Sequence, residues 1–523
     1  MSGTAVCLTA LGCARNDVDA EELAARLDRA GFELVDDPAA AEVVVVNTCG
    51  FIDQAKEESI DCLLAAAELK AAGRLKAVVA TGCLAERYGR DLAQALPEAD
   101  AIVGFDGYAD LATTLRGLLE GRPAPAAHRP RDRRRLPLTP VARPATGEPL
   151  EFGPAPAAQS TGLAGPSSVA PGAVASSAGP SSTGSASSVA ESALLGLAEP
   201  SAVGLTVRSP ACGPPPLRWR LDDAPTAPLK IASGCDRRCA FCAIPAIRGG
   251  LVSRPADQVL AEAGWLAGQG VKEIFLVSEN TTAYGKDWGD RSALARLLPR
   301  LGAVEGVEWL RLSYLQPAEL GPELIAAMAA VPQVVPYFDL PFQHAARPVL
   351  RRMRRLGEAD SFLELLARVR AGVPEAGIRS NFIVGFPGET AADLQILRDF
   401  LAAGQFDAIG LFPYSDEEGT AAADLDGHLD AAEIAARLAE LADVAEVVMA
   451  ERARRWLDRP VEVLIEARED DHWRGRIPQQ GPDDGETWIR PGAAGQPQAV
   501  GRLVPAQVER TDGVDLVATG LNG

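Results

Sequence analysis

Short apolar runs alternate with amphipathic helical patterns in two long stretches of this chain, and this alternation constrains the fold more than any other feature. In the first stretch the apolar runs are VCLTAL, VVVVN (43–47) and KAVVATG (76–82), and helical patterns follow near 17–30, 52–72 and 84–95. Strands that alternate with helices of this length are typical of βαβ units with a parallel sheet. We therefore predict an α/β fold that begins with an open parallel-sheet domain over residues 1–121.

The alternation resumes in the second half of the chain. Each of six apolar runs is followed by a helical pattern; the runs are LKIAS (229–233), EIFLVS (273–278), EWLRLS (308–313), PYFDL (336–340), RSNFIV (379–384) and DAIGLF (407–412). Six such units predict a partial β/α barrel over residues 229–457, closed by a long helix near 429–457. Barrels of this kind hold their chemistry at the carboxyl ends of the strands.

Two regions depart from the alternation. Residues 122–228 begin with the basic run HRPRDRRR and continue as a segment rich in Ala, Ser, Gly and Pro. This segment has too few large apolar residues to offset the conformational entropy that folding would cost. We predict a disordered insertion there, and interpret its basic run as solvated charge rather than as a contact with ribosomal RNA. Residues 458–523 hold short apolar segments between turn signals, which predicts a small β-barrel.

The length, net charge and hydropathy of the chain limit the class of protein to which it can belong. A length of 523 residues suggests about three domains. The net charge of −20 disfavours nonspecific binding to nucleic acid and suits a basic partner. No apolar run approaches the roughly 18 residues of a membrane helix, and no Lys or Arg precedes the first apolar stretch, so we expect neither a membrane partner nor a signal peptide. We expect a cytoplasmic protein.

The segment GCDRRCAFCAIP (234–245) carries the strongest chemical signal. It places Cys235, Cys239 and Cys242 in a C-x3-C-x2-C spacing, in the loop that leaves the first predicted barrel strand. Nine cysteines in a reducing compartment favour metal or redox use over disulfides. Three thiolates of one loop can each ligate one iron of a 4Fe–4S cluster and leave the fourth iron open. Structural zinc usually takes four protein ligands, and no fourth Cys or His lies nearby.

Three further cysteines share a position relative to predicted strands. Cys13, Cys49 and Cys83 each fall just past the carboxyl end of a predicted parallel strand, where open α/β sheets gather ligands. They could converge on a second 4Fe–4S cluster, or they could be buried cysteines without a ligand, since cysteine is commonly buried. Spacing alone leaves both interpretations open. The remaining cysteines are interpreted as structural: Cys7, Cys62 and Cys212.

Several longer segments resemble a known family. The segments LGCARNDVDAEEL, NTCGFIDQAKEESID and ATGCLAERY resemble the N-terminal domain of radical S-adenosylmethionine (SAM) methylthiotransferases, and SGCDRRCAFCAIPAIRG resembles their SAM loop. The resemblance continues through SENTTAYGKD, RLSYLQP, DLPFQHAARPVLRRMRR, SNFIVGFPGET and FPYSDEEGT. The C-terminal barrel is similar, more weakly, to a TRAM domain. The text CGFIDQAKEES after Cys49 is similar to the RimO branch of the family.

The resemblance implies an activity and its cofactors. It implies transfer of a methylthio group to the β-carbon of an aspartate in the twelfth protein of the small ribosomal subunit. It implies SAM as a cofactor together with two 4Fe–4S clusters. By resemblance, the auxiliary cluster is held by Cys13, Cys49 and Cys83, and the SAM cluster by Cys235, Cys239 and Cys242. The reductant and the sulfur donor are left open.

The resemblance also suggests contacts with SAM. Phe241 matches an aromatic position that packs on adenine in the superfamily. Glu279 and Gly385, the latter within VGFPGE (384–389), are candidate contacts, for which a strand-end side chain and an ordinary turn are the alternatives. Gln343 and His344 follow the fourth barrel strand, where a structural histidine and a substrate contact are both open.

Two alternative functions compete with this one. A tRNA methylthiotransferase acting on isopentenyladenosine or a related base shares the clusters and the fold. However, residues 458–523 hold 12 acidic and 7 basic side chains, a net of 7 − 12 = −5, whereas a barrel serving tRNA should be basic. We therefore do not expect tRNA as a partner, and we assign Trp473 and Trp488 to the barrel core. A noncatalytic metal-binding protein of the ribosome is the other alternative, and it would not cleave SAM.

Overall fold

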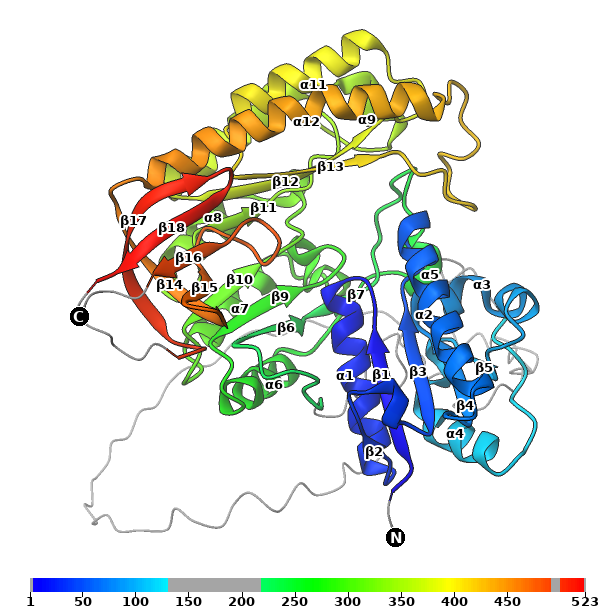
Figure 1. Ribbon diagram of the computed structural model, residues 1–523. Helices are drawn as coiled ribbons and strands as arrows, with labels where there is room; N and C mark the ends of the chain where they lie inside the picture. Colours follow the sequence, from blue (N-terminus) through cyan, green and yellow to red (C-terminus); the bar gives the residue numbers. More distant parts are fainter. Residues whose placement is uncertain (1–2, 130–217, 491–498, 522–523) are drawn as a thin grey trace, which may run out of the picture. The chain divides into compact units, whose positions relative to one another are not determined.

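The computed structural model describes residues 3–129, 218–490 and 499–521. All described residues belong to one compact unit. Three modules follow one another along the chain (Figure 1), at the places where the sequence predicts an open sheet, a partial barrel and a small β-barrel. Most of the predicted insertion, Cys212 included, lies outside the described residues. No helix in the described ranges has both the length and the apolar character needed to cross a bilayer.

The N-terminal module is a five-stranded parallel sheet with the order β2-β1-β3-β4-β5. Its strands are β1 (Ala5–Ala10), β2 (Glu33–Leu34), β3 (Val43–Thr48), β4 (Ala77–Thr81) and β5 (Ala101–Ile102), and its helices are α1 (Ala14–Arg29), α2 (Asp53–Ala71), α3 (Gly82–Ala95) and α4 (Leu111–Leu119). Every residue of β3 is buried. Val43 and Val45 enter one core and Val44 and Val46 the other, because side chains alternate along a strand and helices cover both faces of the sheet.

The central module contains all six predicted parallel strands. They are β6 (Thr226–Lys230), β9 (Glu273–Val277), β10 (Trp309–Leu312), β11 (Tyr337–Asp339), β12 (Gly377–Val384) and β13 (Ala408–Pro413). They form two three-stranded sheets, β10-β9-β6 and β11-β12-β13, which a parallel bridge between Leu310 and Val334 connects. The partial β/α barrel is thus confirmed.

Helices follow the barrel strands and enclose a large apolar core. They are α6 (Ala256–Gly268), α7 (Ala293–Gly302), α8 (Pro322–Ala330), α9 (Arg347–Arg352), α10 (Ala359–Gly372), α11 (Ala391–Gly404) and α12 (Ala431–Ala453). The long helix expected near 429–457 is α12. A short hairpin of β7 (Ala232–Ser233) with β8 (Val252–Ser253) frames the cysteine loop and helix α5 (Ile244–Arg248).

Both ends of the predicted insertion differ from the expectation of disorder. Arg218 is 3% exposed, and its Nε lies 3.3 Å from Glu21 and 3.1 Å from Glu262. At the other end, the backbone N–H of His128 donates to the Ile102 carbonyl at 3.3 Å, so this histidine is not part of a solvated charge run. The limits at 122 and 228 are therefore too wide. Composition misses them because each end is held by partners far away in the sequence.

The C-terminal module is a closed barrel with the order β14-β15-β16-β18-β17. Its strands are β14 (Pro460–Glu469), β15 (His472–Arg476), β16 (Thr487–Arg490), β17 (Leu503–Asp512) and β18 (Asp515–Gly520). This confirms the predicted small β-barrel. Trp473 packs against the core of this barrel, as expected, and Trp488 is half-buried.

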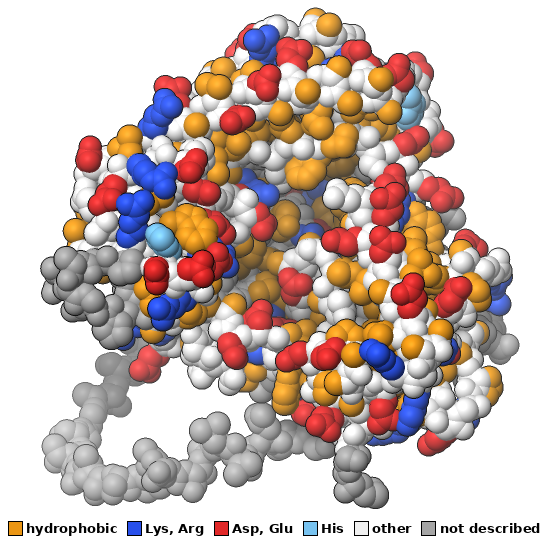
Figure 2. All heavy atoms as spheres, in the orientation of Figure 1, with side chains coloured by type: hydrophobic (Ala, Val, Ile, Leu, Met, Phe, Trp, Pro, Cys, Tyr) orange, Lys and Arg blue, Asp and Glu red, His pale blue; other side chains and the backbone are white. Residues whose placement is uncertain are grey.

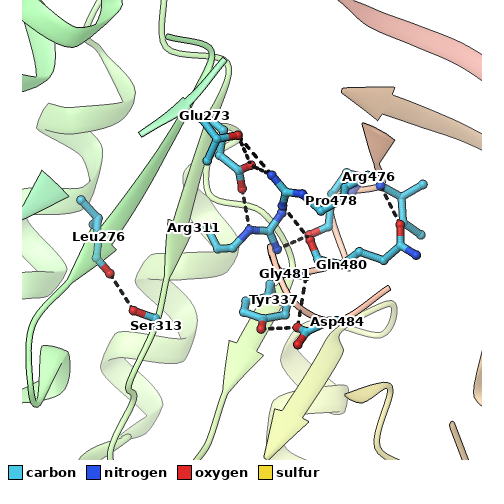
Figure 3. A network of polar contacts seen from close by, with 12 residues as sticks. Glu273, Leu276, Arg311, Ser313, Tyr337, Arg476, Pro478, Gln480, Gly481 and Asp484 are labelled. Atoms are coloured by element: carbon cyan, nitrogen blue, oxygen red, sulfur yellow. Dashed lines mark hydrogen bonds and ion pairs between the residues drawn. The ribbon is translucent and has the colours of Figure 1, made fainter. Parts of the chain in front are cut away.

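A buried ionic network joins this barrel to the central strands (Figure 3). The Glu273 carboxylate lies between the guanidinium groups of Arg311 and Arg476, and Arg311 Nη1 donates to the Pro478 carbonyl at 2.9 Å. Burial alone would raise the pKa of Glu273, but the two guanidinium groups lower it to about 2. Strands β9 and β10 are therefore joined to the first hairpin of the C-terminal barrel by buried ion pairs.

Candidate active site

The first group of cysteines, which we call the loop triad, consists of Cys235, Cys239 and Cys242 and lies between β7 and α5. The Cys235 N–H donates to the Gly249 carbonyl at 3.0 Å, which closes the loop at its base. Gly234 has φ +78°, and a Cβ on it would lie 2.1 Å from the Gly250 carbonyl oxygen. Glycine is therefore required at the start of the loop.

The loop triad is also held from the opposite side of the barrel. The Ala240 N–H donates to the Met353 carbonyl at 3.0 Å, and the Ala240 carbonyl accepts from the Ala422 N–H at 2.9 Å. Burial raises the pKa of Cys235 to about 11 and that of Cys242 to about 12, and negative charge on Cys239 adds to both shifts. The thiols thus sense one another's charge, as expected for side chains that face one site.

The second group, the sheet triad, consists of Cys13, Cys49 and Cys83. These cysteines follow β1, β3 and β4, which are adjacent in the sheet, so the three carboxyl ends lie side by side. A Cβ on Gly12, whose φ is +97°, would lie 2.7 Å from Cys49 Sγ. Burial raises the pKa of Cys83 to about 12, with charge on Cys13 and Cys49 adding to the rise. The structure therefore brings the three cysteines together.

The spacing of the thiols bears on what each triad could hold. In the described parts of the chain, no group of three or more His, Cys, Asp or Glu side chains is close enough for one metal ion. Ligands of a four-iron cluster bind different irons and stand farther apart than ligands of one ion. Each triad supplies three thiols that interact through their charges. Their role as cluster ligands remains a prediction that this geometry supports.

Two arginines that the sequence reasoning missed lie beside the sheet triad. Arg248, at the end of α5, places Nη2 3.5 Å from Cys83 Sγ and Nη1 2.9 Å from Asp19. Arg15 donates to the Ser278 carbonyl at 3.0 Å and stacks over the Tyr314 ring at 4.6 Å. Although burial opposes it, the two arginines lower the pKa of the Cys13 thiol, which favours the thiolate that iron requires.

A third arginine lies beside the loop triad. Arg355 Nη1 is 3.8 Å from Cys239 Sγ, and its Nη2 donates to Gln316 at 3.1 Å and to the Pro341 carbonyl at 2.6 Å. Arg355 belongs to the text RRMRR, which the sequence analysis quoted without assigning a role. Basic residues that follow one another give no sign of which one turns inward.

The predicted SAM contacts fall at three different places. Phe241 packs half-buried against the barrel core, beside Cys242 in sequence. The Glu279 side chain is 3% exposed and lies 3.4 Å from Arg15 and 3.6 Å from Arg248, and neither of its oxygens accepts a hydrogen bond from the described residues. Gly385 has φ +80° and donates its N–H to Glu389, and a Cβ on it would lie 2.5 Å from the Ile434 side chain.

The other singled-out residues have structural partners. His344 is fully buried, with Nε2 3.2 Å from Glu389 and Nδ1 accepting from the Ala346 N–H at 3.0 Å. The Gln343 N–H donates to the Asn381 carbonyl at 2.9 Å. Cys7 packs into a core of the N-terminal module, and Cys62 lies half-buried against the same core.

Two of these modules match known protein families. The family model described as "Uncharacterized protein family UPF0004" matches residues 5–104, and that of the Radical SAM superfamily matches residues 229–401. A protein of Kineococcus radiotolerans named "Ribosomal protein uS12 methylthiotransferase RimO" is 52% identical, covering 99% of this chain and 98% of its own length. A protein of the same name from Cutibacterium acnes is 50% identical, covering 98% of both chains.

Among solved structures, the radical SAM methyltransferase TsrM from Kitasatospora setae has a TM-score of 0.47 and 15% identity. The match covers 79% of this chain and 73% of that chain. A likeness this distant carries no conclusion about the present chain.

Proposed function

This chain belongs to the family of the ribosomal protein uS12 methylthiotransferases RimO, and from that premise we propose that it adds a methylthio group to the β-carbon of an aspartate of uS12. The observation that carries the proposal is the pair of cysteine triads, one in each of the two matched modules. We assign the auxiliary 4Fe–4S cluster to the sheet triad and the SAM cluster to the loop triad.

The chain's residues hold and shield these cofactors. When bound, SAM and the clusters supply the radical chemistry that an unactivated carbon requires and that no side-chain acid or base provides at neutral pH. Arg15 and Arg248 bring positive charge to the sheet triad, which offsets part of the charge of its thiolates. Ala240, which lies between two cysteines of the loop triad, is buried in the core under the barrel strands, and this supports shielding of that side of the loop from water. Phe241, Glu279 and Gly385 remain candidate SAM contacts.

The charge of the molecule supports a basic protein substrate. Figure 2 shows Asp and Glu side chains spread over the face drawn, in keeping with the net charge of −20. Binding of tRNA would call for a basic surface to neutralise phosphates, and the C-terminal barrel is acidic overall. A ribosomal protein as substrate also supports a location of the enzyme in the cytoplasm.

Mass spectrometry tests the proposal directly. Ribosomal proteins and tRNA are compared from cells with and without this gene. We expect uS12 to carry one methylthio group on an aspartate in the parent and none in the deletion strain. An unchanged uS12, with a methylthio group lost from a tRNA adenosine instead, would assign the chain to tRNA modification. Loss of neither group, together with no SAM cleavage by the purified protein, would favour a noncatalytic role.

A further inference from the structure

Two buried arginines each reach one thiol of a different triad. Arg248 Nη2 lies 3.5 Å from Cys83 Sγ in the sheet triad, and Arg355 Nη1 lies 3.8 Å from Cys239 Sγ in the loop triad. Arg248 is 4% exposed and Arg355 is 8% exposed. A guanidinium stays charged in such a place, because arginine is not deprotonated in proteins.

We propose that these arginines set the reduction potentials of the two clusters separately, Arg248 at the sheet triad and Arg355 at the loop triad. The proposal rests on the proposed function in so far as the triads hold clusters. Both arginines act through a cysteine ligand, so they are positioning residues rather than catalytic ones.

Arg248 reaches the sheet triad from the other module. It ends helix α5, which directly follows the loop triad, yet its guanidinium contacts several groups of the N-terminal module as well as Glu279 of the central module, which lies 3.6 Å from Nε. Nη1 pairs with Asp19 at 2.9 Å, Nη2 contacts Asn16 Oδ1 at 3.4 Å, and the group lies 5.0 Å from the centre of the Phe105 ring. These contacts fix the guanidinium against Cys83 and leave it little freedom to turn away.

Arg355 is fixed in a different way. Its Nη2 donates to the Gln316 side chain and to the Pro341 carbonyl, both neutral acceptors. No carboxylate in the described ranges forms an ion pair with Arg355. Its Nη1 lies 3.8 Å from Cys239 Sγ, so its charge is directed at the loop triad.

Elementary electrostatics gives the direction of the effect. Reduction of a cluster by one electron adds one negative charge and leaves every covalent bond in place. A guanidinium beside a ligand sulfur stabilises the more negative, reduced form, and a buried site screens this attraction weakly. Removing the guanidinium therefore shifts the midpoint potential to more negative values. We expect about a tenfold loss in the ratio of reduced to oxidised cluster at fixed potential, or about 59 mV for one electron.

The test uses the full-length protein reconstituted anaerobically with iron and sulfide. Wild type, Arg248→Gln and Arg355→Gln are reduced stepwise with dithionite, and the electron paramagnetic resonance signal of each cluster is followed against the solution potential. Signals are assigned with two triple variants, one lacking the three cysteines of the sheet triad and one lacking those of the loop triad. Arg248→Gln should shift only the sheet-triad cluster, and Arg355→Gln only the loop-triad cluster.

Arg254→Gln is the matched control. Arg254 is also buried and ion-paired, to Glu262 at 2.6 Å, but it forms no hydrogen bond with any thiol that the structure describes. It should shift neither cluster. Equal shifts of both clusters in any variant, or no shift in Arg248→Gln and Arg355→Gln, would overturn the proposal.

Failure of folding and failure of the cluster assignment are both detectable. If Arg248→Gln gives no folded holoprotein, Arg248→Met carries the test: it removes the charge but keeps a long side chain that fills the site, and should shift the sheet-triad cluster alone to more negative potential. Unchanged potentials of both clusters in the methionine variant would then overturn the proposal. Wild type that binds iron for one cluster contradicts the proposed function instead, because the iron count is measured before any potential.

Discussion

The two cysteine triads reach similar chemistry by different routes. The loop triad lies in one segment from Cys235 to Cys242, and local backbone bonds shape it. The sheet triad gathers residues from position 13 to position 83, and its geometry exists only when three neighbouring strands have paired. The geometry of the loop triad thus depends on a short local motif, whereas that of the sheet triad depends on the fold of the whole N-terminal module. The two should therefore respond differently to the same kind of change.

Their surroundings differ as well. Arginines from both modules lie beside the sheet triad, and they lower the pKa of Cys13 although burial opposes this. Burial prevails at Cys49 and Cys83 of the sheet triad and at Cys235 and Cys242 of the loop triad, and it raises their pKa values. Cys13 is the cysteine at which the arginines prevail over burial. The sheet triad is thus the place where the two modules depend on each other, which the following predictions test in order of decreasing effect.

Removal of one cysteine from either triad should abolish methylthiolation of uS12. Cys239→Ala should also abolish SAM cleavage, whereas Cys83→Ala should retain it, because the loop triad is left intact. Cys62→Ala, a half-buried cysteine outside both triads, is the control and should retain both activities. The assay measures 5′-deoxyadenosine and modified uS12 by mass spectrometry. A Cys83→Ala enzyme that still methylthiolates uS12 would remove the sheet triad from the mechanism.

Glycine substitutions can disrupt one triad at a time without replacing a cysteine. Gly12→Ala should lose the sheet-triad iron and Gly234→Ala the loop-triad iron, because each new Cβ would meet a neighbour at 2.7 Å or closer. Gly31 also has positive φ, at +84°, but nothing lies within 4 Å of its Cβ position. Gly31→Ala should cost only about 1–2 kcal/mol of backbone strain and keep all iron. Iron analysis checks these outcomes, and equal iron loss in all three variants would contradict them.

The third prediction concerns a buried network that contains no thiols. Arg476→Met leaves Glu273 buried with one cation fewer and should lower the free energy of unfolding by about 3–5 kcal/mol. Both triads should keep their iron. The control is Arg474→Met, since the exposed ion pairs of Arg474 are worth about 1 kcal/mol or less. Denaturant unfolding followed by tryptophan fluorescence measures the difference, and equal losses in the two variants would argue against a joining role for the network.

The smallest expected effect is a pH-dependent change in the free energy of unfolding at Asp339, which is linked to the sheet triad through Tyr314 and Arg15. Asp339 accepts a hydrogen bond from the Tyr314 N–H at 2.8 Å, and the Arg15 guanidinium stacks over the Tyr314 ring. Burial raises the pKa of Asp339 to about 6, although Arg379 opposes the shift. The folded state therefore binds more protons than the unfolded state between about pH 4 and 6, and the contribution of Asp339 to stability falls as pH rises through that window.

Asp339→Asn removes this titration. The apoprotein variant should be more stable than wild type above pH 6, by about 2–3 kcal/mol, and the difference should vanish near pH 4. Denaturant midpoints between pH 4 and 7 measure it. A difference that does not change with pH would mean that Asp339 is ionised in the fold throughout this range.

Much of this architecture could be predicted from the sequence. The alternation of apolar runs located all six parallel strands of the central barrel, and the C-x3-C-x2-C spacing located the loop triad, because both signals are local. Positions of Cys13, Cys49 and Cys83 at strand ends indicated a common edge of the sheet. However, only the pairing of β1, β3 and β4 brings these residues together, and no short motif contains that pairing.

The arginines could not be predicted, for a physical reason. The contact of Arg248 with Cys83 joins residues 165 positions apart, and that of Arg355 with Cys239 joins residues 116 apart. The ends of the insertion were missed in the same way, since burial of Arg218 depends on Glu21 and Glu262. Composition describes a segment and says nothing about the partners that fix its ends.

The most direct test of the central claim is the iron content and Mössbauer spectrum of the reconstituted full-length protein and its two triple-cysteine variants. Two four-iron clusters predict about eight irons per chain in wild type and about four when either triad is replaced by alanine. Each variant should show a 4Fe–4S spectrum from the remaining triad. About four irons in wild type, lost completely with the loop triad and unaffected by loss of the sheet triad, would contradict the account.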